Sequence, residues 1–255
     1  MVISICPLPA RFQLQPDHVP EHRKAPLSRI AQGPADNGPA WTEQLWQRMR
    51  RYLWLKAIGI SAFMWIFFVG YFHLLRHPAY PITLMPLTAL DHAITFQPGA
   101  VIAYLSLWLY VGIPPGLLLT VRQLIVYGLW VGGLCLAGLA CFYLFPTAVP
   151  AQTLDPDLAR HPAFALLQGV DAAGNAFPSL HVATAMYSAI WIDHLLRTMA
   201  APSALRAINA GWFVLIVYST LATKQHVVLD VLAGAPLGIL FALGSLRWRP
   251  AGPRG

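Results

Sequence analysis

Charged side chains are scarce in this sequence. They make up only 11% of the 255 residues, whereas hydrophobic residues make up 57%. In an average soluble domain, about a quarter of the residues are charged. So little charge cannot cover the surface of a soluble globule of this length, and the composition therefore predicts that much of the protein surface faces lipid.

Cysteine is also rare, with Cys6, Cys135 and Cys141 as the only three. They form neither a paired framework nor a CxxC spacing, and the last two are six positions apart, hence on different faces of a helix. These spacings argue against structural disulfides and against zinc. We expect no metal and no cofactor.

Long apolar runs account for the hydrophobic composition, because a bilayer core of about 30 Å requires roughly 20 apolar residues per helix. We predict an all-α fold, a polytopic membrane helix bundle with about six transmembrane helices. The second predicted span is the weakest, since Pro114, Pro115 and Gly116 interrupt it. The predicted spans are 52–75, 99–118, 122–145, 178–196, 204–221 and 227–246.

Positive charge is distributed unevenly between the predicted connections. The formal net charge of +7 would suggest nucleic-acid binding in a soluble protein, but 14 of the 17 lysines and arginines fall on one side of the predicted spans. The opposite connections hold only Arg76, Arg160 and Lys224. By the positive-inside rule, both termini are expected to be cytoplasmic in a multi-pass protein of the cell (inner) membrane, with no nucleic-acid partner.

The chain divides by composition into two parts. Residues 1–40 are rich in proline, glycine and polar residues, which predicts a disordered cytoplasmic tail, and residues 41–248 form the predicted membrane domain. From Trp41 to Leu53 the apolar residues follow one helical face, with three arginines close by. This pattern fits an interfacial helix before the first span and, equally well, a simple start of that span.

Two outward connections carry recognisable patterns. Apolar residues repeat at helical spacing in residues 84–96, which predicts a short helix on the outer surface. The connection 146–177 is longer and proline-rich, so it is predicted to form a partial lid. Five further polar residues lie on the predicted outward side, namely Asp91, His92, His73, His77 and Arg76. The sequence leaves open whether they bind an acceptor or are only polar residues at the membrane interface.

Two segments contain the residues suited to catalysis. The fourth predicted span opens with GNAFPSLHVATA, where a helix start with free amides, Ser179 and His181 could hold an anion. The sixth opens with TKQHVVLDVLAG, which is predicted to place His226 and Asp230 on one helical face. Both histidines fall at outward helix ends. Ionisable groups at such depths are functional candidates, and Asp230 is expected to pair with His226.

The two segments resemble the type 2 phosphatidic acid phosphatase superfamily of membrane lipid phosphatases and phosphotransferases. PSLH at 178–181 is similar to that family's PSGH, with Leu180 in place of glycine. STLATKQHVVLD at 219–230 is similar to its SR followed by HxxxD, with Thr220 in place of arginine. The residues of both segments look more like the motifs of the branch that contains inositol phosphorylceramide synthases and related lipid phosphotransferases. This resemblance implies sphingolipid substrates.

The resemblance implies a role for each member of the catalytic set. His226 would attack phosphorus and become phosphohistidine, and Asp230 would orient its ring and stabilise the imidazolium. His181 would protonate the leaving alcohol and then deprotonate the incoming water or alcohol, which implies a bell-shaped pH profile. The implied partners are a phospholipid or other lipid phosphate, a water or alcohol acceptor, and the membrane.

Phosphate binding is the less complete part of the resemblance. The family's lysine-containing first signature is absent, and its arginine is replaced by Thr220. Ser179, Lys224 and Arg160 are the candidate phosphate-binding residues, with Lys224 the first substitute for the lost positive charge. Either these residues compensate or the protein is a noncatalytic member.

Three alternatives to a metal-independent lipid phosphatase or phosphotransferase are open. Two histidines and an aspartate could bind zinc, although a further convincing ligand is absent. A small transporter would show polar residues at mid-membrane, whereas the ionisable residues here gather at one end. A noncatalytic membrane interaction protein would tolerate the loss of His226.

Overall fold

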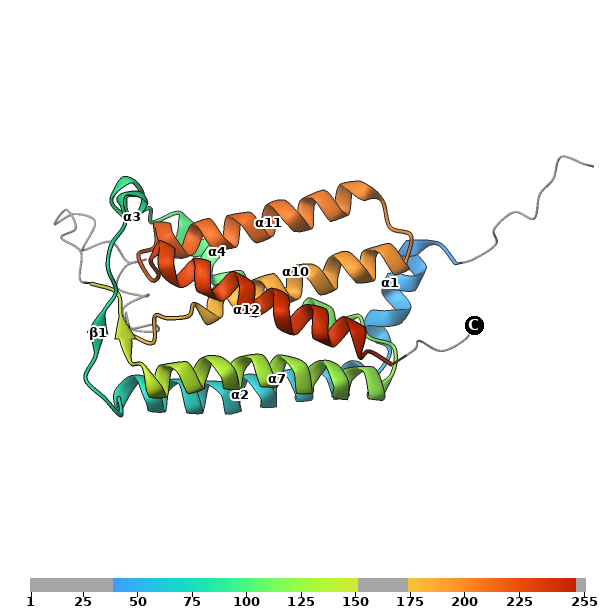
Figure 1. Ribbon diagram of the computed structural model, residues 1–255. Helices are drawn as coiled ribbons and strands as arrows, with labels where there is room; N and C mark the ends of the chain where they lie inside the picture. Colours follow the sequence, from blue (N-terminus) through green and yellow to red (C-terminus); the bar gives the residue numbers. More distant parts are fainter. Residues whose placement is uncertain (1–38, 151–173, 251–255) are drawn as a thin grey trace, which may run out of the picture. The chain divides into compact units, whose positions relative to one another are not determined.

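The computed structural model describes residues 39–150 and 174–250, all within the unit that begins at Pro39. The described chain is mostly helical, which confirms the predicted all-α membrane helix bundle (Figure 1). The helices are α1 (Trp41–Arg50), α2 (Leu53–Arg76), α3 (Ala89–Ala93), α4 (Ala100–Leu105), α5 (Leu107–Tyr110), α6 (Ile113–Gly116), α7 (Val121–Leu144), α10 (Leu180–Thr198), α11 (Ser203–Ala222) and α12 (Val228–Arg247). The strands are β1 (Thr83–Leu84) and β2 (Thr147–Ala148).

Four of the described helices are long and apolar enough to cross a membrane, namely α2, α7, α11 and α12. The predicted number of six spans is therefore not confirmed. The second predicted span is broken into α4, α5 and α6, with breaks at Ser106 and at Val111 and Gly112. Pro114 and Pro115 lie at the start of α6. Proline is tolerated there because the first amides of a helix need no partner within it.

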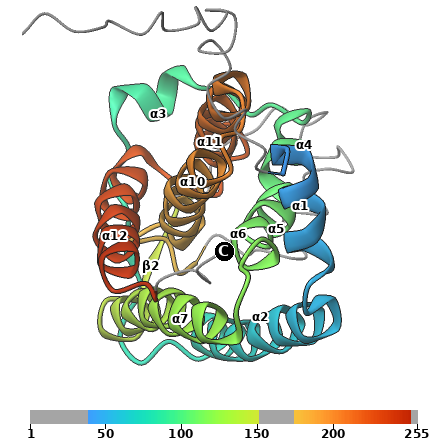
Figure 2. The ribbon, with the colours of Figure 1, turned by 90° about the vertical axis from the view of Figure 1, so that its right-hand side faces the viewer.

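Helix α10 corresponds to the fourth predicted span but lies inside the bundle. It packs against α12, α11 and α7, and Figure 2 shows it among the other helices when the bundle is viewed end-on. Twelve of its 19 residues are buried. A helix that other helices surround can carry more polar residues than one that faces lipid, which explains why α10 is less apolar than α2 or α7.

Helices α10 and α12 approach each other closely because glycines face the α10 backbone. A Cβ atom built on Gly234 would lie 2.3 Å from the carbonyl oxygen of Ser179, and one on Gly238 would lie 2.3 Å from that of Ala183. Neither position can therefore hold a larger residue without separating the two helices. This contact fixes the start of α10 against the start of α12.

Buried polar side chains also join α10 to its neighbours. The Ser245 oxygen on α12 lies 2.9 Å from Tyr187 Oη and 3.2 Å from Trp191 Nε1, both on α10. Asn209 on α11 donates to the Ala189 carbonyl and accepts from Tyr110 Oη, at 3.0 and 2.6 Å. Hydrogen bonds of this kind stabilise helix association where lipid offers no competing partner.

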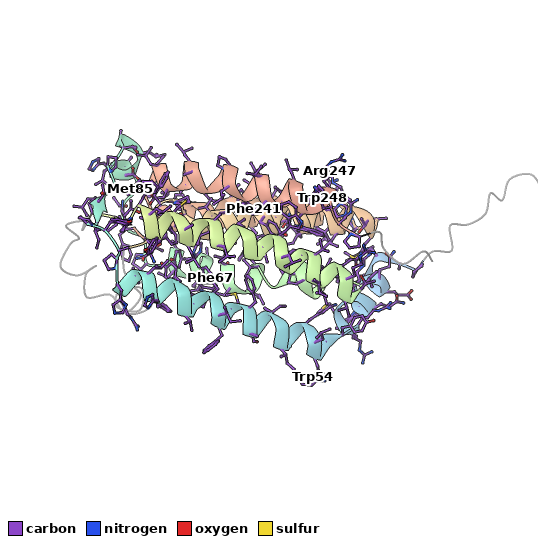
Figure 3. All side chains as sticks on the ribbon, turned by 60° about the horizontal axis from the view of Figure 1, so that its bottom comes forward. Trp54, Phe67, Met85, Phe241, Arg247 and Trp248 are labelled. Atoms are coloured by element: carbon purple, nitrogen blue, oxygen red, sulfur yellow. The ribbon has the colours of Figure 1, made fainter. Side chains whose placement is uncertain are left out.

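The helix predicted around residues 41–53 is present as α1, separate from the first span. Tyr52 adopts a left-handed conformation with φ of 56°, and α2 begins at Leu53. Lys56 of α2 joins this region to the end of α6, because its Nζ donates to the carbonyl oxygens of Arg48 and Gly116 at 2.6 and 2.8 Å. We call this side of the bundle the α1 end. Figure 3 shows Arg247 and Trp248 there.

The opposite side, which we call the site end, carries two connections that pair through short strands. Strand β1 runs parallel to β2, with Thr83 opposite Thr147 and Leu84 opposite Ala148. Met85 follows β1, and Figure 3 places it far from Arg247 and Trp248. The helix predicted within 84–96 is present as α3 but covers only five residues. Most of the predicted lid, and the predicted tail up to Gly38, lie outside the described residues.

Candidate functional site

His181 lies in the first turn of α10, as predicted, at the site end. Ser179 caps this helix, and its Oγ accepts the Val182 amide at 3.2 Å; Pro178 lies just before the cap. The buried imidazole stacks on the Tyr104 ring with centroids 4.1 Å apart, and its Nε2 lies 3.2 Å from the Tyr104 carbonyl oxygen. Because a carbonyl can only accept, this hydrogen bond places the hydrogen on Nε2.

His226 is not part of α12, and the prediction that it shares a helical face with Asp230 is wrong. Helix α12 begins at Val228, and His226 lies in the turn after α11. The amides of Gln225 and His226 both donate to the Thr220 carbonyl oxygen, each at 3.2 Å. The end of α11 therefore positions this histidine.

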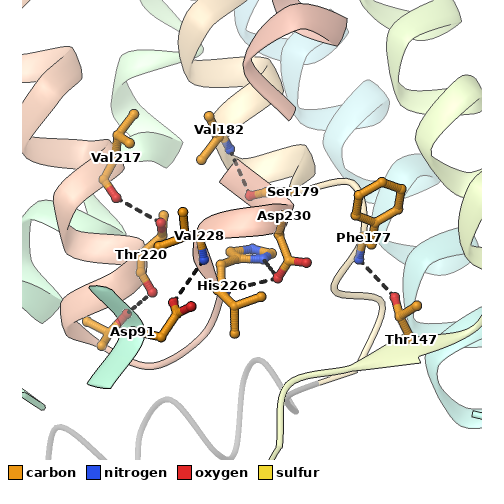
Figure 4. A network of polar contacts seen from close by, with 12 residues as sticks. Asp91, Thr147, Phe177, Ser179, Val182, Val217, Thr220, His226, Val228 and Asp230 are labelled. Atoms are coloured by element: carbon orange, nitrogen blue, oxygen red, sulfur yellow. Dashed lines mark hydrogen bonds and ion pairs between the residues drawn. The ribbon is translucent and has the colours of Figure 1, made fainter. Parts of the chain in front are cut away.

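Asp230 nevertheless lies beside His226, because its carboxylate turns back across the start of α12. Its Oδ2 accepts the Val227 amide at 3.0 Å and lies 3.5 Å from His226 Nδ1 (Figure 4). The second contact has the length of an ion pair and is longer than a hydrogen bond. Asp230 is fully buried, so its charge is held where it acts strongly on the ring of His226.

The two histidines come together at the site end. Their ring centroids are 6.4 Å apart, with an angle of 56° between the ring planes. Since Nδ1 of His226 faces Asp230, the other ring nitrogen, Nε2, is the one available for chemistry. The sequence predicted from the helix ends that both histidines lie at one depth, and the packing of α10 against α11 and α12 brings their rings together.

Unpartnered polar atoms are concentrated beside these histidines. Among the described residues, the buried side-chain nitrogen and oxygen atoms without a hydrogen-bond partner are Gln225 Oε1, His226 Nδ1 and Asp230 Oδ1. Folded proteins leave few such atoms, because each costs about 1–3 kcal/mol. That all three belong to residues 225–230 is typical of a functional site.

The candidate phosphate-binding residues have different surroundings. Ser179 is fully buried, and its amide donates to the Asp230 carbonyl oxygen at 3.1 Å, which joins the two helix starts directly. Lys224 Nζ donates to the carbonyl oxygens of Asp91, at 2.8 Å, and Ile94. An ammonium has three donors, so two of those of Lys224 are used within the protein. Arg160 lies outside the described residues.

The charge of Lys224 is affected by burial. Desolvation lowers the pKa of its ammonium, and the nearby Asp91 carboxylate raises that pKa by a smaller amount. Thr220, at the position where the resembled family has arginine, is buried, and its hydroxyl donates to the Val217 carbonyl oxygen at 2.8 Å. This position therefore contributes neither a positive charge nor a hydroxyl hydrogen to a phosphate.

Asp91 is one of the residues on this side that the sequence left unassigned, and the structure gives it defined contacts. Its Oδ1 accepts the Val228 amide at 2.9 Å, and its Oδ2 accepts the amide and the hydroxyl of Thr88 at 2.8 and 2.7 Å. The first amides of α12 are thus satisfied by two carboxylates, Asp230 at Val227 and Asp91 at Val228. A Thr-x-x-Asp spacing signals the start of α3, but no sequence signal shows the contact with Val228.

Replacing Asp91 by alanine is expected to destabilise the protein. Several donors around this buried carboxylate, including the Val228 amide, would lose their acceptor, at a cost of about 1–3 kcal/mol. Asp91→Asn retains one oxygen and should lose less. Thermal unfolding of the purified protein in detergent checks the order wild type, Asp91→Asn, Asp91→Ala. Equal unfolding temperatures for all three would show that the contact with α12 contributes nothing.

Metal ligands are not grouped in the part of the chain that the structure describes. Within residues 39–150 and 174–250, no set of three or more histidine, cysteine, aspartate or glutamate side chains could hold a metal ion. The described site contains two imidazoles, a buried carboxylate and helix-start amides.

Comparison with known proteins gives one family match. No curated protein and no solved structure matches the chain. A family match covers the segment that contains α10, α11 and α12, and hence both histidine motifs. Members of that family are generally phosphoesterases with a helical membrane fold, which agrees with the four membrane-length helices found here. Residues 143–254 match the PAP2 superfamily.

Proposed function

We propose that the protein is an integral membrane lipid phosphatase or headgroup phosphotransferase that acts through a phosphohistidine intermediate. The observation that carries the proposal is the facing pair His181 and His226, with centroids 6.4 Å apart and Asp230 3.5 Å from the second ring. The PAP2 match and the apolar helices support a lipid phosphate as substrate. The inositol phosphorylceramide synthase-like branch, with sphingolipid substrates, is part of the proposal.

In the first half of the reaction, Nε2 of His226 attacks phosphorus and the bond from phosphorus to the leaving oxygen breaks. His181 gives a proton to that oxygen, so the alcohol leaves neutral. Asp230 keeps the His226 ring oriented and stabilises the positive charge that develops on it. Ser179, Lys224 and Arg160 are proposed to bind the phosphate oxygens, since phosphoryl transfer depends mainly on position and charge.

In the second half, His181 takes a proton from water or from an alcohol, whose oxygen attacks phosphorus. The bond between phosphorus and Nε2 breaks, and His226 returns to its starting state. Water yields free phosphate, whereas an alcohol yields a new phosphate ester. We place this site at the outer membrane face with both termini cytoplasmic, on the basis of the charge distribution between the connections.

The experiment that tests the proposal traps the intermediate. Purified full-length protein in detergent is incubated with phosphatidic acid or ceramide phosphate carrying a radiolabelled phosphate, then quenched in alkali. A phosphohistidine is stable to alkali and labile to acid, so we expect protein-bound label that acid removes, together with phosphate release that a chelator leaves unchanged. Turnover without any protein-bound label would contradict the covalent mechanism. Inhibition by the chelator would favour a metal site.

Adding an alcohol separates the two reaction types. Inositol or glycerol added with the lipid should decrease free phosphate and form a new phosphate ester if the protein is a phosphotransferase. Unchanged phosphate release identifies a phosphatase. No phosphate or headgroup release from any lipid tested would favour a noncatalytic interaction protein.

A further inference from the structure

A long apolar cavity runs through the bundle from the catalytic histidines toward the α1 end. Its volume is about 340 Å³, and its walls come from side chains of α2, α4 to α7 and α10. Figure 2 shows the arrangement of these helices when the bundle is viewed end-on. His181 and His226 line it at the site end, and Lys56 lines it at the α1 end. The remaining lining is mostly aliphatic and aromatic. The cavity is thus continuous with the site and suited to hydrocarbon.

The dimensions of the cavity correspond to one hydrocarbon chain. Along α2 its lining extends from Leu55 to Tyr71, which at 1.5 Å per residue is a length of about 24 Å. An apolar cavity of about 150 Å³ holds one benzene molecule. By that measure the volume here holds one chain of roughly a dozen carbons, which is shorter than the lined length of about 24 Å, and it leaves no room for a second chain.

Polar contacts close the cavity at the α1 end. Lys56 Nζ donates to the Arg48 carbonyl oxygen on α1 and to the Gly116 carbonyl oxygen at the end of α6. Arg48 donates to the neighbouring Leu117 carbonyl oxygen at 3.4 Å. An apolar chain that reached these groups would have to displace them from one another, at the cost of buried hydrogen bonds.

We propose that this cavity binds one hydrocarbon chain of the lipid phosphate, with the phosphate at His226 and the chain terminus near Lys56. This inference rests on the proposed function and adds a limit on chain length to it. In a two-chain lipid the second chain would remain in the bilayer. The cavity therefore selects substrates by the length of one chain.

Two glycines allow a direct test. Gly59 and Gly128 line the cavity in its half nearer the α1 end, and a Cβ atom built on either would meet nothing within 4 Å. A leucine there would fill part of the cavity without displacing the packed helices. Gly211 on α11 also has open space at its Cβ position but is not among the lining residues, so Gly211→Leu is the matched control.

The first readout is kcat/KM for two alkyl monophosphates, one of about six and one of about twelve carbons, in the same detergent. In Gly128→Leu we expect kcat/KM for the longer substrate to fall about tenfold, a typical consequence of overfilling a packed interior. The shorter substrate and Gly211→Leu should match wild type. Equal losses on both substrates, or none on either, would overturn the proposal.

The second readout does not require turnover. A twelve-carbon alkyl phosphate with a photoreactive group on its terminal carbon is crosslinked to the His226→Ala variant, and the labelled peptides are mapped. We expect label near Lys56 and Gly59 that Gly128→Leu abolishes and Gly211→Leu leaves unchanged. Label that is unaffected by Gly128→Leu would overturn the proposal. If crosslinking is as expected but wild type releases no phosphate, the cavity proposal stands and the catalytic one fails.

Discussion

Replacing His226 by alanine is expected to reduce phosphate release by at least about a thousandfold, because loss of a covalent nucleophile has effects of this order or larger. The variant has no ring nitrogen at position 226 to attack phosphorus. The same change should abolish protein-bound label in the trapping experiment. Both quantities are measured with the purified variant in detergent.

His92→Ala is the matched control for this change. His92 lies on the exposed side of α3, in the same region of the bundle, so its loss removes an imidazole without touching the site. We expect its activity to equal that of wild type. Full activity in His226→Ala would exclude the proposed nucleophile, and label remaining in that variant would require a different nucleophile.

Replacing Asp230 by asparagine is expected to lower kcat by up to about ten-thousandfold, the loss seen when a carboxylate that orients a catalytic histidine loses its charge. An asparagine oxygen could still accept the Val227 amide, so the start of α12 should remain intact. The negative charge that stabilises a protonated or phosphorylated His226 ring would be gone. Rapid-quench measurement should therefore show slower formation of the phosphorylated protein at saturating substrate.

Asp193→Asn provides the comparison for the loss of an aspartate charge. Asp193 is paired with Arg197 and Arg206 at 2.7 and 2.6 Å near the α1 end, far from the histidines. Its substitution should change kcat little, because partly exposed ion pairs contribute little. If Asp230→Asn retained normal kcat, the buried carboxylate would have a structural role only.

The membrane helices could be predicted from sequence because apolar runs of the required length leave few alternatives. This argument succeeded for α2, α7, α11 and α12, which are long and apolar enough to cross a membrane and are mostly not buried inside the bundle. It succeeded less well for 99–118, where the backbone breaks into three short helices. Hydropathy indicates that such a segment lies in an apolar environment, but it does not determine where packing interrupts the helix.

The candidate site was predictable in composition but not in local geometry. Helix ends placed His181 and His226 at one depth, and the structure brings their rings together. The spacing of His226 and Asp230 suggested a shared helical face, whereas the turn after α11 and the capping carboxylate produce their contact instead. Asp91 could not be assigned because its partner is 137 positions away, and one sequence gives no information about such pairs.

The bond between Asp91 and Val228 has a consequence for biogenesis. Synthesis proceeds from the amino terminus, so α3 is synthesised long before its partner amide exists. Lys224 likewise reaches back to Asp91 across 133 positions. The region around the histidines can therefore take its final form only when α12, the last described helix, has inserted. A ribosome-bound or truncated chain that ends before Val228 would hold all the earlier helices and still lack a completed site.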